Sequence, residues 1–102
     1  MSDYIEDVRR YAPDADEGAV STIVKYLGIA LQGKDSALVS CSDPGELARV
    51  RDGFCRKKLG LEAAVADAAI EAACQTMSGE RNKHRVTFYY LVAQETGTLD
   101  RL

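Results

Sequence analysis

Residues 82–95 read NKHRVTFYYLVAQE and decide how the rest of the chain folds. The run from Thr87 to Val92 holds β-branched and aromatic residues that are also typical of a strand. We predict a helix instead, from Asn82 to a point before Gly97, because no partner strand is evident and the segment is long for a strand in so small a domain. Its apolar residues cover more than half of the helix circumference, which predicts a central helix surrounded by the others.

Four more helices are expected before this one, because apolar residues recur there at helical spacing. Residues 34–42 (KDSALVSCS) form an irregular connector that we expect to lie extended across the core. The predicted fold is all-α, a compact single-domain bundle of about five helices with a central apolar C-terminal helix. The first four helices are expected at residues 3–11, from 14 or 16 to 33, between 43 and 60, and at 62–77.

The third helix has the clearest boundaries in the sequence. Asp43 is expected to cap its N-terminus, with Pro44 at the first helical position and Glu46 at the third. Gly60 is expected to end it in the left-handed conformation, and Leu61 would make the hydrophobic contact of a Schellman turn. We therefore assign structural roles to Asp43, Pro44, Glu46 and Gly60.

Length and composition limit the function. A chain of 102 residues that is 46% hydrophobic predicts one globular domain over residues 1–102, and a net charge of −3 is unlike that of a general nucleic-acid binder. The start has no signal-peptide pattern and no apolar run approaches a membrane span, so we expect a cytoplasmic protein that does not enter the membrane. The odd count of three cysteines, Cys41, Cys55 and Cys74, predicts reduced thiols.

Two blocks of sequence resemble a known family. They are VSCSDPGELARVRDGFCRKKLGL, from Val39 to Leu61, and RNKHRVTFYYLVAQ, from Arg81 to Gln94. Both are similar to domain of unknown function family 2853, a family of small bacterial proteins. The chain departs from the family pattern at His84, where a tyrosine is expected, and at residues 53–55. The resemblance implies a helical fold and a cytoplasmic bacterial protein, and it implies no activity.

The basic block at residues 81–85 (RNKHR) is the sharpest functional signal. Cations at a helix N-terminus oppose the helix dipole, so we expect either pairing with carboxylates such as Asp43 or a bound anion. We favour internal pairing, with Asn82 as the N-cap. The alternative is an anion or phosphate site whose ligand-binding residues are Arg81, Asn82, Lys83 and Arg85.

A second basic cluster lies in the third helix, with Asp52 among its members. Helical spacing predicts a solvated surface in which these charges pair with acids, and contact with phosphate or nucleic acid is the alternative. The cluster comprises Arg49, Arg51, Arg56, Lys57 and Lys58.

The sequence gives no positive signal for catalysis. Cys41 and His84 are expected at the same end of the bundle and contain the ingredients of thiol catalysis, but no orienting group is evident. We interpret Cys41 as a small residue packed beneath a helix start, and Cys55 and Cys74 as core or border residues. Tyr89 and Tyr90 point about 100° apart on a helix, so they form no stacking platform and are expected in the core. We therefore predict no enzyme activity, no cofactor and no metal site.

The leading functional hypothesis is a non-enzymatic binding or protein-interaction module. An unknown protein partner or a second copy would dock on an alanine-rich or apolar helix face, which makes a homodimer one expected form. Anion or phosphate binding at the start of the last helix is the alternative. Nucleic-acid binding comes third, because the net charge is negative.

Overall fold

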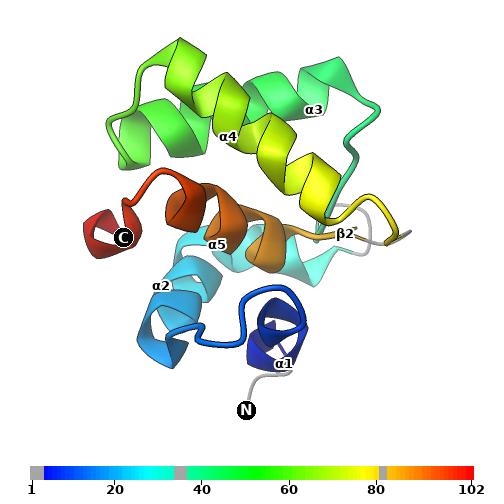
Figure 1. Cartoon of the computed structure of the whole chain (residues 1–102), viewed down its shortest axis with the longest axis vertical. Coiled ribbons are helices and arrows are strands. Elements are labelled where there is room, and N and C mark those ends of the chain that lie inside the picture. Colours follow the sequence, from blue (N-terminus) through cyan, green and yellow to red (C-terminus); the bar gives the residue numbers. More distant parts are fainter. Residues whose placement is uncertain (1–3, 34–36, 81–82) are drawn as a thin grey trace.

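A computed structural model describes residues 4–33, 37–80 and 83–102, and its architecture is the predicted all-α bundle (Figure 1). Its elements, in chain order, are α1 (Tyr4–Arg9), α2 (Glu17–Leu27), the 3₁₀ helix η1 (Gly28–Gln32), β1 (Leu38–Val39), α3 (Pro44–Arg49), the π-helix η2 (Val50–Lys58), α4 (Ala63–Thr76), β2 (Lys83–His84), α5 (Arg85–Glu95) and the 3₁₀ helix η3 (Leu99–Arg101).

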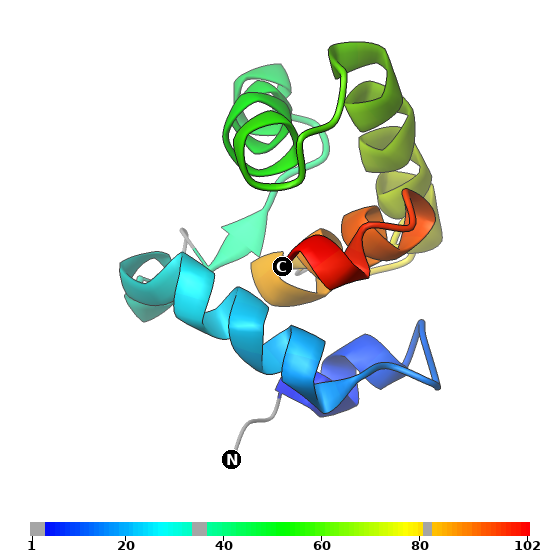
Figure 2. The same cartoon turned by 90° about the vertical axis from the view of Figure 1, so that its left-hand side faces the viewer.

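Helix α5 is the centre of the bundle, as its sequence predicts. Every residue from Arg85 to Ala93 is buried. Helices α1 and α2 pack against one side of α5 and α4 packs against another (Figures 1 and 2). Tyr89 and Tyr90 are 7% and 2% exposed, which confirms that they lie in the core. A helix that is apolar all round is stable in water only when other elements cover each of its faces.

The predicted start of this helix at Asn82 is wrong. The helix begins at Arg85, and His84 holds the N-cap position with extended backbone angles. Lys83 and His84 instead form β2, which pairs antiparallel with β1. This pairing, together with a 2.8 Å hydrogen bond from Arg85 N to Ala37 O, supplies partners for backbone groups at the start of α5 that have none within the helix. Asn82 and Arg81 lie outside the described residues.

Strand β1 lies in the predicted connector, although the sequence shows no strand pattern there. The register places Leu38 opposite His84 and Val39 opposite Lys83. Two residues are too few to produce an alternating hydrophobic pattern. Within the described part of the connector, residues 37–42, Leu38 and Val39 are extended and hydrogen-bonded into a small sheet, and a turn follows at residues 41 and 42.

The start of the third predicted helix is confirmed in detail. The Asp43 carboxylate accepts hydrogen bonds from Gly45 N at 3.0 Å and Glu46 N at 3.4 Å, and Pro44 occupies the first turn. Beyond Arg49, however, the α-helix widens into the π-helix η2.

The π-helix η2 buries Val50, Phe54 and Cys55. Its hydrogen bonds reach five residues back, as from Leu59 N to Phe54 O at 3.1 Å. Phe54 and Cys55 are consecutive, yet both are buried in the same core. Gly60 then adopts the predicted positive φ of 70°, and Leu61 N bonds to Cys55 O at 2.9 Å, which closes the helix end.

The first two helices meet α5 through polar contacts as well as apolar ones. Asp16 caps α2 by accepting from Ala19 N at 3.2 Å, and its own N–H donates to the Tyr90 hydroxyl at 3.1 Å. Thr87, fully buried in α5, donates to the carboxylate of Asp7 on α1. The central helix therefore carries hydrogen-bonding groups that fix where α1 and α2 dock. Asp3, where the first helix is expected to begin, lies outside the described residues.

No helix in the three described ranges combines the length and the hydropathy that a bilayer crossing requires.

We expect Phe88→Ala to lower the free energy of unfolding by about 3–5 kcal/mol, because Phe88 is fully buried in α5 and its removal leaves a cavity. Ile29→Ala is the matched control, since Ile29 is 83% exposed and its truncation should change stability by less than about 0.5 kcal/mol. Urea unfolding followed by circular dichroism measures both values. Similar losses in the two variants would contradict a central position for α5.

Candidate functional site

Arg85, the last cation of the basic block, is paired inside the protein. It is 8% exposed, and its Nη1 donates to Glu46 Oε2 at 2.8 Å. Its Nη2 donates to Leu38 O at 3.0 Å, and its guanidinium lies 5.9 Å from the centre of the Tyr89 ring. Internal pairing is confirmed for Arg85. The partner is Glu46 rather than Asp43, whose carboxylate is engaged with the N-terminus of α3.

Burial and hydrogen bonding together fix the charge states of Arg85 and Tyr89. Burial lowers the pKa of Arg85, but the hydrogen bonds to Glu46 and Tyr89 outweigh burial and leave that pKa above its ordinary value. Burial also raises the pKa of Tyr89, and the nearby Arg85 charge only partly opposes this. The site therefore holds a permanent guanidinium beside a neutral phenol at neutral pH.

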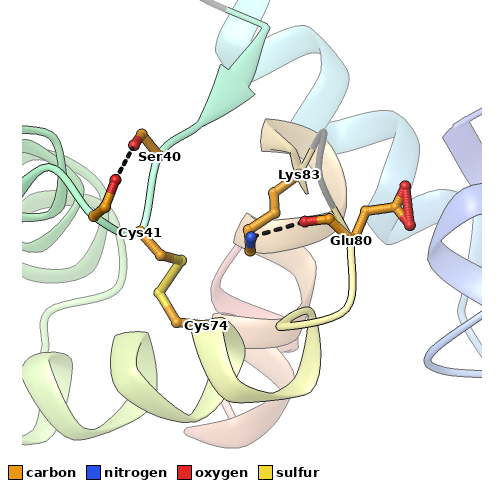
Figure 3. Close-up of a disulfide and its surroundings, with 6 residues drawn as sticks. Ser40, Cys41, Cys74, Glu80 and Lys83 are labelled. Carbon is orange, nitrogen blue, oxygen red and sulfur yellow. Dashed lines mark hydrogen bonds between the residues drawn. A yellow bond between two sulfur atoms is a disulfide. The ribbon is translucent and has the colours of Figure 1, made fainter.

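Lys83 and His84 point away from each other, because successive side chains on a strand face opposite sides. The His84 ring packs edge-on against Tyr4 of α1, with ring centres 6.5 Å apart. Lys83 faces the other way, and its Nζ donates to Glu80 O at 2.8 Å (Figure 3).

Lys83 forms part of the wall of a pocket with a volume of about 650 Å³, which we call the disulfide pocket. It lies where β1, the segment before α3, and the C-terminal part of α4 come together. Leu38, Val39 and Glu46 complete one side of it. Its chemically distinctive lining residues are Ser40, Cys41, Ser42, Cys74, Ser78 and Lys83.

Cys41 and Cys74 form a disulfide, which corrects the prediction of reduced thiols (Figure 3). It also rules out the considered Cys41–His84 pair, since His84 packs against Tyr4. The two cysteines are 33 residues apart, and only the packing of the segment before α3 on α4 brings their Cα atoms within 5.9 Å. Nothing in their spacing indicates the bond.

Cys55 is a core residue, as predicted. It is fully buried in η2 and is a free thiol. Burial, with a smaller effect from the charge of Asp67, raises the pKa of Cys55 to about 11. It is therefore protonated and inert at neutral pH.

In the basic cluster of the third helix the three arginines pair with acids, as favoured from the sequence. Arg51 bonds to Asp52 at 2.9 Å, and Arg56 lies 3.9 Å from the same carboxylate. Arg49 pairs with Glu46 at 3.7 Å. Lys58 lies over an aromatic ring rather than near an acid, with its Nζ 5.6 Å from the ring centre of Tyr26 on α2.

The lining of the disulfide pocket can hydrogen-bond to a ligand. Three serine hydroxyls and one ammonium group can donate to a ligand in the disulfide pocket, and the adjacent Glu46 is neutralised by Arg85. Of the predicted anion-site residues, the structure places Lys83 in the pocket wall and Arg85 in the ion pair behind it. Sequence reasoning missed the three serines, because nothing local sets them beside Lys83.

No cluster of three or more histidine, cysteine or acidic side chains suited to a metal ion occurs within residues 4–33, 37–80 and 83–102.

Comparison with known proteins agrees with the resemblance seen in the sequence. A family model described as "Protein of unknown function (DUF2853)" matches residues 3–100. No curated protein matches the chain.

We expect Arg85→Met to destabilise the fold by about 3 kcal/mol, because it leaves the largely buried Glu46 carboxylate with only the long 3.7 Å contact to exposed Arg49. Arg49→Met is the control. Arg49 pairs with the same Glu46, but its side chain is 72% exposed, so its loss should cost at most about 0.5 kcal/mol.

The measurement is urea unfolding of both single variants and of the double variant Arg85→Met with Glu46→Gln. Removal of the carboxylate should recover part of the loss caused by Arg85→Met, since the penalty comes from an uncompensated charge. Equal costs for Arg85→Met and Arg49→Met would show that the buried pair has no special role.

Proposed function

The chain belongs to the family of proteins of unknown function DUF2853, and we propose that it is a non-enzymatic binding module whose disulfide pocket takes a small anionic ligand. One observation carries the proposal: Lys83 and three serine hydroxyls line one pocket. The volume of about 650 Å³ lies within the range of small-molecule sites.

The charges around the pocket support an anion. The ammonium of Lys83 has three donors, and its bond to Glu80 O uses one of them. Glu46 would repel an anion, but the Arg85 guanidinium 2.8 Å away neutralises it. The pocket wall therefore carries the positive charge of Lys83 without an opposing free carboxylate among its lining residues.

The hydroxyl groups supply the rest of the ligand contacts. Ser40 Oγ and Ser42 Oγ lie 3.1 Å apart, and Ser78 approaches from the end of α4. Hydroxyls of this kind donate to anionic oxygens without themselves carrying charge. With His84 turned toward Tyr4, no imidazole lines the pocket to activate a serine, which supports binding without chemistry. Arg81 and Asn82 stay predicted contacts, and both lie outside the described residues.

We expect sulfate and inorganic phosphate to raise the melting temperature of the protein above its value in chloride of equal ionic strength. A ligand at ten times its Kd adds about 1.4 kcal/mol, which is about 6–11 °C for a domain of this size. The anions should stabilise Lys83→Met much less than the wild type. Lys25→Met is the control, because it removes the same charge from an exposed position on α2. No anion-specific gain, or equal gains in both variants, would overturn the proposal.

A second candidate function is self-association through α4. Val65 is 46% exposed, and Ala64 and Ala68 lie exposed beside it. Together with Thr96 after α5 they line a shallow hollow. Small side chains allow two helices to approach closely, and a face of this kind on two copies can pair about a two-fold axis.

Sedimentation velocity over a range of protein concentrations tests this second candidate. The wild type should form a dimer whose population rises with concentration, and Ala68→Arg should abolish it, because a charged side chain would be buried without a partner. Ser21→Arg, at an exposed position on α2, should leave the dimer intact. A wild-type chain that stays monomeric at every concentration would exclude self-association.

A further inference from the structure

The disulfide is open to solvent from two directions. Cys41 and Cys74 are both only partly buried. Both line the disulfide pocket, and both also line a second hollow of about 320 Å³ on the other side of the bond. A structural disulfide in a core has no such access, so this bond can be reached by a small reductant.

The two approaches differ in charge. The second hollow is lined by Asp67 and Glu71 of α4, whereas the disulfide pocket carries Lys83. The species that attacks a disulfide is a thiolate, which is an anion. Approach from the Lys83 side is therefore attractive and approach from the side of the two acids is repulsive.

We propose that the Cys41–Cys74 bond is a site of thiol–disulfide exchange, reached through the disulfide pocket by a low-molecular-weight thiol that carries an anionic group. The docking of the anionic group beside Lys83 rests on the proposed function of the pocket. The exposure of the disulfide does not depend on that function.

The exchange balances in two steps. A thiolate RS⁻ attacks one sulfur of the disulfide, the S–S bond breaks, and the products are a mixed disulfide with the protein and one cysteine thiolate. A second RS⁻ attacks the sulfur of R in the mixed disulfide, forms RSSR and releases the other cysteine as a thiolate. The two protein thiolates then take up protons from water to the extent that the pH lies below their pKa values. Overall, two RSH are oxidised to RSSR and the disulfide is reduced to two thiols.

Reduction would change the pocket itself. The bond joins the segment that carries Ser40 and Ser42 to α4, and Ser78 lies two residues beyond the end of that helix. Figure 3 shows Ser40 directly before Cys41, on the segment that the disulfide joins to Cys74 of α4. The redox state of the bond would therefore set how firmly the pocket holds its ligand.

The test measures the rate of disulfide reduction by three thiols of similar size: 2-mercaptoethanesulfonate, which is anionic, 2-mercaptoethanol, which is neutral, and 2-aminoethanethiol, which is cationic. Rates are expressed per thiolate present. We expect the order anionic, neutral, cationic, from fast to slow. In Lys83→Met the ratio of the anionic to the neutral rate should fall about threefold to fivefold, the effect of one nearby charge at a protein surface. Lys25→Met should keep the wild-type ratio.

Cys55 provides an internal control for the integrity of the fold. After reduction, iodoacetamide should label Cys41 and Cys74 while Cys55 stays unlabelled, because it is buried and its pKa is about 11. Labelling of all three cysteines at one rate would mean that reduction unfolds the domain. The disulfide would then be purely structural, and the proposed exchange site would be rejected.

Two further outcomes would overturn the inference. The first is that mass spectrometry of the air-oxidised protein finds Cys41 and Cys74 as free thiols. The second is that the ratio of the anionic to the neutral rate is the same in Lys83→Met and Lys25→Met. The proposed function is tested separately with ethanesulfonate, which has the anionic group and no thiol. If ethanesulfonate stabilises the protein and the rate ratios do not depend on Lys83, the binding proposal stands and the exchange proposal fails. If the ratios depend on Lys83 and ethanesulfonate has no effect, the exchange proposal stands without the binding site.

Discussion

The burial of α5 on every side is the constraint on which the rest of the structure depends. From Arg85 to Ala93 each residue is shielded from water, so no face of this helix can be left uncovered. Helices α1 and α2 cover it from one side and α4 from another (Figure 2). The covering helices can be short, such as the six-residue α1, because contact with α5 rather than their own length stabilises them.

The same burial creates a problem at the start of α5, where a guanidinium enters the core. An isolated buried cation is very costly, and Arg85 is tolerated because Glu46 and the carbonyl of Leu38 meet it. These two partners come from α3 and β1, so the guanidinium of Arg85 joins α5 to both of these elements. The strand pairing of β1 with β2 and the disulfide pocket lie at this junction.

The pocket combines groups that have separate structural origins. Lys83 is directed into it because a strand alternates its side chains, and Ser40 and Ser42 reach it because they follow β1 directly. Cys74 arrives from α4, which packs on α5 through small residues such as Ala69 and Ala73. Binding and redox chemistry would thus meet at one place, although no single segment of the chain encodes that place.

The sequence by itself determined the features that depend on neighbouring residues: the helical class, the central position of α5, the Asp43 cap and the turn at Gly60. Caps, periodicity and glycine turns act over a few residues, so they can be read locally. Only the tertiary structure decided the start of α5, the π-helical turns of η2, the choice of Glu46 over Asp43 as the partner of Arg85, and the Cys41–Cys74 bond. Apart from η2, each of these joins segments more than 30 residues apart. Such choices depend on how whole helices pack around α5, because a side chain's distant partners are set by the fold and not by its neighbours in sequence.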